Sequence, residues 1–382
     1  MEIRLYRPPE VGDIKIVPLL VTQCATARYI ENYFTFGEFE FSVANDAYGS
    51  DRFDKYLLVL INRSYWGLIL SIEKQMDASG GNMLTISGID LKGLINARVT
   101  TPPGFTYQEV GGIAGFDTAT GSTETCMKHF IASNFFDNNS PTRSVAGLTI
   151  APDLGRGFSA DKYMTRFEPL SEVLYALGRG AGIGYAIVPD INAGTLVFDC
   201  IEGLDRSALQ SVNPRIVFEI ERRNVAAMTY QNSDKNMRNL FYASLSGSTF
   251  IDDTYTATVT RGVAPLPTGI HRWEQHLDIS ASHPTAGAEL DELVRLALAR
   301  AESYVSVETF QAQILNTPLS YGVDYFIGDI VTVQNREWGI TMNTRLTSMT
   351  IEASNSGIAH NATFGDAAVN IFERLKREIR GG

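Results

Sequence analysis

Residues 38–44 read EFEFSVA, and this short stretch indicates the fold of the first part of the chain. Its apolar and polar side chains alternate strictly, with Phe39, Phe41 and Val43 in one set and Glu38, Glu40 and Ser42 in the other. Because successive side chains of a β-strand point to opposite faces, the pattern predicts an antiparallel strand with one buried and one solvated face.

Further apolar runs flank this strand and predict more strands of the same kind. They are IVPLLVT (16–22), YLLVLIN (56–62) and WGLILSIE (66–73), separated by turn-rich stretches. In TISGIDLKGLINA (85–97) a strand ends at Gly88, and the carboxylate of Asp90 can cap a short helix. We therefore expect residues 1–100 to form a first β-barrel with this helix at one end.

The pattern changes to helices and strands between residues 101 and 212. Two helices are predicted by apolar side chains at helical spacing, namely Met127, Phe130 and Ile131 in the first and Leu170, Val173, Leu174 and Leu177 in the second. The second helix stops at GRGAGIG (178–184), and the strands YAIVPD (185–190) and TLVFDCIE (195–202) follow. We interpret this segment as an inserted α+β peripheral domain.

Strand patterns return after residue 213. They occur in VAAMTYQN (225–232), NLFYASLSG (239–247), TYTATVT (254–260), HRWEQHLDIS (271–280), FIGDIVTVQ (326–334), WGITMNTRLTSMTIEAS (338–354) and IAHNATFG (358–365). A helical insertion is expected around 283–320, centred on the helix 288–304, and Asp366 is expected to cap a closing helix at 366–380. Residues 213–382 thus predict a second β-barrel, and the fold class is mainly β with two peripheral modules.

The ends of the two predicted barrels resemble each other. In the first, Trp66-Gly67 leads through a turn to a strand-end Gly88 and the capping Asp90; in the second, Trp338-Gly339 leads to Gly365 and Asp366. This echo indicates a duplicated barrel, although Trp-Gly pairs and capped helices also coincide by chance. A trimer of a two-barrel chain would present six similar barrels in a ring.

Composition excludes several classes of protein. Hydrophobic residues make up 44% and charged residues 20%, which is typical of a globular chain, and the formal net charge of -11 disfavours tight binding of nucleic acid. No signal peptide and no apolar stretch long enough for a membrane segment is found in the sequence. Cys24, Cys126 and Cys200 are far apart and odd in number, which predicts buried free thiols.

Taken in order, these segments resemble the phage tail hub family, which comprises the baseplate hubs of contractile tails and the tail-associated hub proteins of siphoviruses. The similarity is greatest to a Rhodococcus siphovirus hub-like group. The stretches that carry it, in chain order, are MEIRLY, GEFEFSV, TISGIDLKGLINARV, LSEVLYALGRGAGIGY, LVFDCIEGLDRS, NPRIVFEIERRN and YGVDYFIGDIVTVQNREWGITMNTRLTSMTIE with ATFGD.

The resemblance implies two tail-tube-like barrels, a homotrimeric ring and a lumen through which DNA passes without specific binding. It implies as partners a hexameric distal tail or tail tube protein, a tape measure protein and a downstream tip or fibre protein. The expected location is the virion tail tip, assembled in the host cytoplasm. Since the sequence stops at Gly382, we expect no C-terminal lysin or fibre domain of the kind that some members carry.

Residues with catalytic or metal-binding chemistry have plainer explanations. His271, His276 and His283 near Glu274 and Asp278 form the best metal candidate, but His271 and His276 would lie on opposite faces of one strand. GRGAGIG ends a helix and opens a strand, which is the reverse of a nucleotide-binding loop.

The acids give no better candidate. Asp324 and Asp329 are close enough in sequence to be considered as the carboxylate pair of a glycoside hydrolase. We favour instead a turn at Gly328-Asp329 that sets the register of the next strand. Asp252 and Asp253 are adjacent and point apart. We therefore expect no catalytic, cofactor-binding or metal-ligating residue and no cofactor, and we predict a protein that is not an enzyme.

Three alternatives stay open. In the first, the chain is the hub of a phage-derived injection particle such as a tailocin or gene transfer agent. In the second, it is a cell-wall-active enzyme with a polar cleft in residues 101–200. In the third, it is a carbohydrate-binding tip protein that uses Trp66, Trp273 and Trp338. For the tryptophans we favour core packing, because Trp66 and Trp338 lie in predicted strands. A further hypothesis is that acidic side chains line the lumen and keep DNA from adhering.

Overall fold

A computed structural model gives the fold of the chain. It describes residues 1–76, 82–103, 116–136, 143–246, 254–260, 268–278, 294, 297, 301, 304–315, 318–355 and 357–365. The chain divides into two compact units, one built from Met1–Met228 and Gln311–Phe364, the other from Thr229–Phe310 and Gly365–Gly382.

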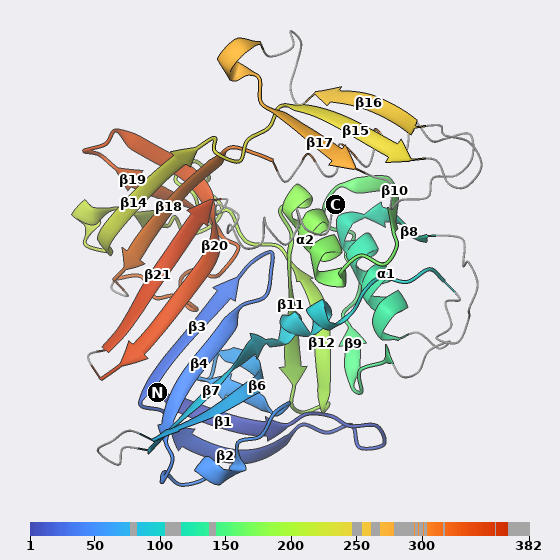
Figure 1. Ribbon diagram of the computed structural model, residues 1–382. Helices are drawn as coiled ribbons and strands as arrows, with labels where there is room; N and C mark the ends of the chain where they lie inside the picture. Colours follow the sequence, from blue (N-terminus) through green and yellow to red (C-terminus); the bar gives the residue numbers. More distant parts are fainter. Residues whose placement is uncertain are drawn as a thin grey trace. The chain divides into compact units, whose positions relative to one another are not determined.

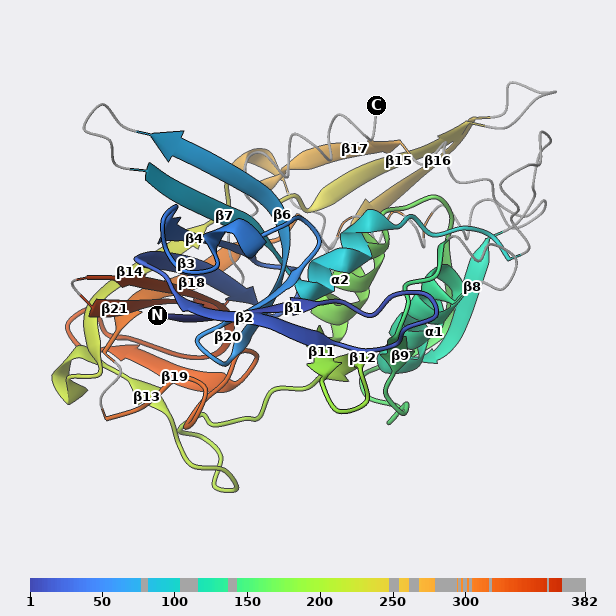
Figure 2. The same ribbon diagram turned by 90° about the horizontal axis from the view of Figure 1, so that it is seen from below.

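The first unit is built on a large, mainly antiparallel sheet (Figures 1 and 2). Its N-terminal strands are β1 (Glu2–Arg7), β2 (Val17–Gln23), β3 (Thr26–Asn32), β4 (Glu38–Ala44), β5 (Leu58–Ile61), β6 (Tyr65–Met76) and β7 (Asn82–Asp90). Its C-terminal strands are β13 (Val217–Phe218), β19 (Ile330–Asn335), β20 (Ile340–Ser354) and β21 (Gly357–Gly365), and the sheet continues into β14 (Val225–Ser233) and β18 (Val307–Ile314), each of which lies partly in the second unit. The strand order is β14-β18-β21-β20-β3-β4-β7-β6-β5-β1-β2, and β19 pairs with both β20 and β13.

One strand pair joins the two ends of the chain. The long β20 pairs through its first half with β19 and through its second half with β21 and β3, with Ile351 opposite Tyr29. Figure 1 shows the blue β3 beside the orange-red β20. The two strand groups, β1–β7 and β13 with β18–β21, are therefore two parts of one continuous sheet. In the described part of the chain, the strand pairings do not show either group closing into a barrel.

The alternation in residues 38–44 has the predicted consequence. Phe39, Phe41 and Val43 are at most 3% exposed, whereas Glu38 and Glu40 are exposed. The predicted short helix is present as a 3-10 helix, η2 (Leu91–Ala97), and Asp90 caps it by accepting a hydrogen bond from the Gly93 amide. Local patterning and local capping thus agree with the tertiary fold.

The helices and strands between residues 117 and 201 are grouped here as the α+β module. It contains α1 (Thr123–Phe135), α2 (Leu170–Ala181), the ribbon β8 (Asp117–Ser122) with β10 (Ser159–Thr165), and the sheet β9 (Leu148–Ile150), β12 (Thr195–Ile201) and β11 (Gly184–Asp190). Both helices pack on this sheet, and Met127, Phe130 and Leu174 are fully buried. The same hydrophobic cluster continues into Leu58 and Leu60 of β5 and Leu91 of η2, so the module shares its core with the large sheet.

The second unit holds a three-stranded sheet of β16 (Thr254–Thr260), β15 (Leu240–Ser246) and β17 (Glu274–Asp278), and the 3-10 helix η5 (Gly269–His271) comes shortly before β17 in the sequence. Phe241 and Leu277 pack against Ala297 and Ala301, which are spaced by one helical turn. Most of the predicted helix 288–304, the closing helix 366–380 and its cap Asp366 lie outside the described residues.

The predicted fold class, mainly β with α+β modules, is confirmed. The three predicted domains, 1–100, 101–212 and 213–382, stay a prediction. The prediction that Trp338 lies in a strand was wrong. It lies in the turn between β19 and β20 and is 46% exposed, because Asn335 accepts a hydrogen bond from its amide and Gly339 at φ 65° reverses the chain.

Candidate assembly surfaces

Tyr33, directly after β3, joins three parts of the first unit. Its hydroxyl donates to the Ile201 carbonyl at the end of β12 (2.7 Å) and accepts from the Gly203 amide (3.2 Å). Its own amide donates to Thr347 of β20 (2.9 Å), and the Arg345 guanidinium lies 5.0 Å from its ring centre. One buried tyrosine thus ties the first strand group, the α+β module and the second strand group together.

Two glycines make room for this ring, and a third lets two backbone segments approach each other beside it. A Cβ atom at Gly184 would lie 2.5 Å from the Tyr33 ring, and one at Gly328, where φ is +92°, would lie 2.1 Å from it. A Cβ at Gly203 would lie 1.9 Å from the Gly328 carbonyl oxygen. Two glycines of GRGAGIG have structural roles here: α2 ends at Ala181 and Gly182 follows with φ 71°, and Gly184 faces Tyr33.

Asp329 forms a second tie between the same parts. Its carboxylate accepts from the Leu204 amide (2.8 Å) and from Arg206 Nε (2.8 Å), and both charged side chains are nearly buried. Asp324 instead accepts from the backbone amide four residues before it (2.7 Å), within a turn. The structure thus gives each of the two acids its own backbone partner in a turn or junction.

A buried charged pair lies at the base of η2. Asp90 accepts from the amides of Gly37 (2.8 Å) and Gly93 (3.1 Å), and Lys92 donates to the carbonyls of Asn32 and Tyr185. Burial raises the pKa of Asp90 to about 6, against the opposing effect of Lys92 and of the two amides. Burial likewise lowers the pKa of Lys92.

A four-charge network lies inside the α+β module. Arg156 donates to both carboxylate oxygens of Glu124 (2.9 Å each), Lys128 contacts Glu124 at 2.7 Å, and Asp199 pairs with both cations. Burial would raise the pKa of Glu124, but the hydrogen bonds from Arg156 and Lys128 outweigh it and hold this pKa well below its usual range. The network fixes the loop 151–158 over the start of α1, because Lys128 also donates to Pro152 O (2.6 Å).

The solvated face of the first strand group is acidic. Strand register places Glu352, Arg28, Glu40, Ser87 and Ser71 in one row across five strands, since cross-strand partners point to the same side. Glu38 and Glu73 lie on the same face. We call Glu38, Glu40, Glu73 and Glu352 the acidic face; all four are exposed, and the exposed Arg28 pairs with Glu352 at 3.2 Å.

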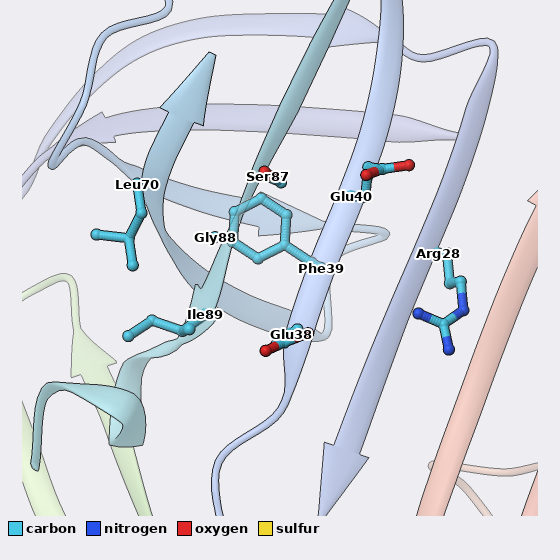
Figure 3. A pocket seen from close by; sticks show the side chains of 8 residues that line it. All are labelled: Arg28, Glu38, Phe39, Glu40, Leu70, Ser87, Gly88 and Ile89. Carbon is cyan, nitrogen blue, oxygen red and sulfur yellow. The ribbon is translucent and has the colours of Figure 1, made fainter. Parts of the chain in front are cut away.

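A shallow hollow of about 390 Å³ lies on the acidic face. Figure 3 shows Glu38 and Glu40 on one strand, Arg28 on the next, and Leu70 and Ile89 on the opposite side. A β-bulge between Ile69 and Ser71 turns Leu70 outward, where it is 39% exposed.

A second hollow, of about 480 Å³, lies between the two strand groups. Its wall is mixed. The aromatic and aliphatic members are Tyr29, Phe326, Ile327, Ile351 and Ile358, and the polar members are Glu31, Asn62, Ser64, Tyr321 and His360. The Tyr321 hydroxyl donates to Glu31 (2.7 Å). We call it the joint hollow.

The histidines of the metal candidate are not brought together in the described residues. His271 lies in η5, where a strand was predicted, and His276 lies on β17, where its Nε2 is 2.8 Å from Ser244 Oγ. His283 lies outside the described residues, as do Asp252 and Asp253. Across the part of the chain that the structure describes, no group of three or more His, Cys, Asp or Glu side chains is placed to hold a metal ion.

The three tryptophans have separate environments. Trp66 packs on Tyr6 with ring centres 5.0 Å apart and joins the core, as predicted. Trp273 is 46% exposed and has the Arg238 guanidinium 5.7 Å from its ring centre.

The three cysteines are buried and free, as predicted. Among the described helices, none is long and apolar enough to cross a membrane.

Comparison with known proteins gives the fold and the family. The solved structures of similar fold include the 43 kDa tail protein of prophage MuSo2 from Shewanella oneidensis, with a TM-score of 0.54, 12% identity, and coverage of 95% of this chain and 98% of that one. They also include the tail protein from Neisseria meningitidis MC58, with a TM-score of 0.52, 15% identity and 96% coverage of both chains. No curated protein matches the sequence. The family model of the Siphovirus ReqiPepy6 Gp37-like proteins matches residues 19–366. The expected resemblance to phage tail hubs is thereby confirmed at the level of the family, and the chain belongs to the family of Siphovirus ReqiPepy6 Gp37-like proteins.

Proposed function

We propose that this chain is the hub at the tip of a phage tail, a trimeric ring that links the tail tube or distal tail ring to the tip. The observation that carries the proposal is the family match over residues 19–366, supported by a fold shared end to end with two tail proteins. Its partners are then a hexameric tail tube or distal tail protein, a tape measure protein and a tip or fibre protein.

The sheet supports a ring with two similar elements per chain. The hairpins β6–β7 and β20–β21 are both antiparallel, and each has a register shift near its base, between Ile69 and Ser71 and between Leu346 and Ser348. Three chains would contribute six such hairpins, a number that matches a hexameric neighbour. The Tyr33 junction would hold the two elements of one chain at a fixed angle.

The mass of the purified protein tests the ring. We expect light scattering to give three times the chain mass of 42.0 kDa and negative-stain images to show a ring with a central hole. A monomer that also fails to join purified tails of the same phage would refute the hub role.

The acidic face is our candidate for the wall of the DNA channel. Four exposed acids against one paired arginine would repel a polyanion within the short screening distance of about 8 Å at physiological salt. DNA does not adhere to a wall that repels it, so it can slide through the channel. In phage particles, Glu38→Lys with Glu40→Lys should slow DNA ejection while tails still assemble, and Glu10→Lys, at an exposed acid outside this face, serves as the control. Normal ejection by the double variant would refute this assignment.

A purely structural role also predicts no cleavage of bacterial cell walls. A turbidity assay with purified walls should show no clearing. Four charged residues of the α+β module are consistent with this role, because Glu124 and Asp199 are each paired with Lys128 and Arg156.

A further inference from the structure

One face of the sheet forms the floor of the joint hollow. Strand register places Tyr29, Ile351 and His360 in one row across β3, β20 and β21, and cross-strand partners point to the same side. Glu31 lies two residues beyond Tyr29 on β3 and therefore on the same face. The floor thus holds a carboxylate and an imidazole among aromatic and aliphatic side chains, and it is the face opposite to the acidic face.

Two turns complete the hollow. The turn between β5 and β6 contributes Asn62 and Ser64, and the segment after β18 contributes Tyr321 and Phe326. In the first turn, Asn62 and Arg63 have φ values of 50° and 62°, which is typical of a two-residue hairpin turn of type I′. The positions of Asn62 and Ser64 are therefore set by the backbone of the hairpin.

Hydrogen bonds fix the segment that carries Tyr321 and Phe326. The Ser320 amide donates to Asp324 Oδ2 (2.7 Å), and the Phe326 amide donates to Asp329 Oδ2 (3.0 Å). A site that is formed in advance loses little binding free energy to the ordering of its own walls. The joint hollow has this property, which is typical of small-molecule sites.

Glu31 gives the hollow its charge. Among the described side chains that line the hollow, none is a lysine or an arginine. Burial lowers the pKa of His360, so this imidazole stays uncharged at neutral pH. Burial raises the pKa of Glu31, against the hydrogen bond from Tyr321 and the more distant charge of Lys92. A cation inside the hollow would therefore stabilise the ionised form of Glu31.

We propose that the joint hollow binds a small organic ammonium ion, with its charged group beside Glu31 and its methyl groups against Tyr321 and Phe326. Aromatic rings attract a cation to their negative faces and cover its apolar surface, which is how proteins recognise quaternary ammonium groups. The volume of about 480 Å³ is in the range of small-molecule sites. A neutral ligand such as a sugar would leave the charge of Glu31 without a partner, so charge separates the two ligand classes.

Titration calorimetry of the purified chain with choline tests the site. Choline should bind, whereas its uncharged isostere, in which carbon replaces the ammonium nitrogen, should bind at least about tenfold more weakly. Glu31→Gln removes the charge but keeps an acceptor for the Tyr321 hydroxyl, and it should weaken choline binding by a similar factor. The matched control is Glu10→Gln, at an exposed acid elsewhere, which should bind choline as the wild type does.

A second pair of variants keeps the test informative if Glu31→Gln does not fold. Phe326 is 47% exposed, so Phe326→Leu should unfold at the temperature of the wild type. It should nevertheless weaken choline binding severalfold, because an aliphatic side chain does not attract a cation as an aromatic ring does. Phe158→Leu, at a side chain that is 71% exposed elsewhere, is the control and should leave binding unchanged.

Three outcomes would overturn the proposal: no heat of binding with choline, equal binding of choline and its uncharged isostere, or unchanged binding by Glu31→Gln and Phe326→Leu. None of them bears on the hub role, which is decided by the mass of the assembled protein and by its incorporation into tails.

Discussion

Glu124 shows how much one residue can contribute to the stability of the α+β module. It is 0% exposed and is held by Arg156 and Lys128. Removing one partner of a buried ion pair leaves the other charge desolvated, which typically costs about 3 to 5 kcal/mol. We expect Arg156→Met to lower the free energy of unfolding by about 3 kcal/mol, as measured by urea denaturation.

The exposed pair Arg28–Glu352 provides the matched control. Its side chains are 54% and 50% exposed, and exposed pairs contribute roughly 0 to 1 kcal/mol. Arg28→Met should therefore change the free energy of unfolding by less than about 1 kcal/mol. Equal effects of the two substitutions would contradict the assigned role of the buried network.

Asp90 predicts a specific dependence of stability on pH. Burial raises its pKa from 3.8 to about 6, so the folded chain keeps this proton after the unfolded chain has released it. The contribution of Asp90 to the free energy of unfolding is therefore largest below pH 4 and falls as the pH rises to about 6, by about 3 kcal/mol. In urea denaturation series from pH 4 to 7, the free energy of unfolding of Asp90→Asn should fall less with rising pH than that of the wild type. Parallel pH profiles of the two proteins would refute this role of Asp90.

At the scale of elements, the junction around Tyr33 predicts which glycines are indispensable. Gly203→Ala would place a Cβ atom 1.9 Å from the Gly328 carbonyl, and backbone cannot move aside cheaply. We expect it to lower the melting temperature by several degrees or to prevent folding. Gly180, inside α2 with nothing within 4 Å of its Cβ position, is the control: Gly180→Ala should stabilise the helix by about 0.5 to 1 kcal/mol. A tolerated Gly203→Ala would contradict this packing.

Sequence patterns predicted the strands and helices well where the apolar side chains recur with the period of the element and all lie on its buried face. The strands β4, β11 and β12 and the helices α1 and α2 follow from periodicity because each has one buried face. The Trp338 turn was missed because a Trp-Gly pair before an alternating run looks the same as the pair at Trp66 in β6. Only the partner strand decides where the pairing starts.

At the scale of the whole molecule, residues 234–306 form an insertion between the paired strands β14 and β18. The Asn224 carbonyl accepts from Leu315 (2.9 Å) and the Tyr230 hydroxyl donates to Glu308 (2.8 Å), so β14 and β18 run antiparallel. Replacing residues 234–306 by a short hairpin turn should leave the first unit folded, with a cooperative thermal transition and unchanged strand signal in circular dichroism. An aggregated product without such a transition would show that the first unit depends on the insertion.

The sequence by itself determined the class of fold, the location of most strands and helices, the Asp90 cap, the buried thiols and the family. These depend on side-chain period, local capping and the order of motifs, all of which are read along the chain. The tertiary structure alone decided that β20 pairs with β3, that Tyr33 meets Gly203 and Arg345, and that Glu124 meets Arg156. The reason is physical: these contacts join residues far apart in sequence, and their stability depends on burial that exists only after the sheet has formed.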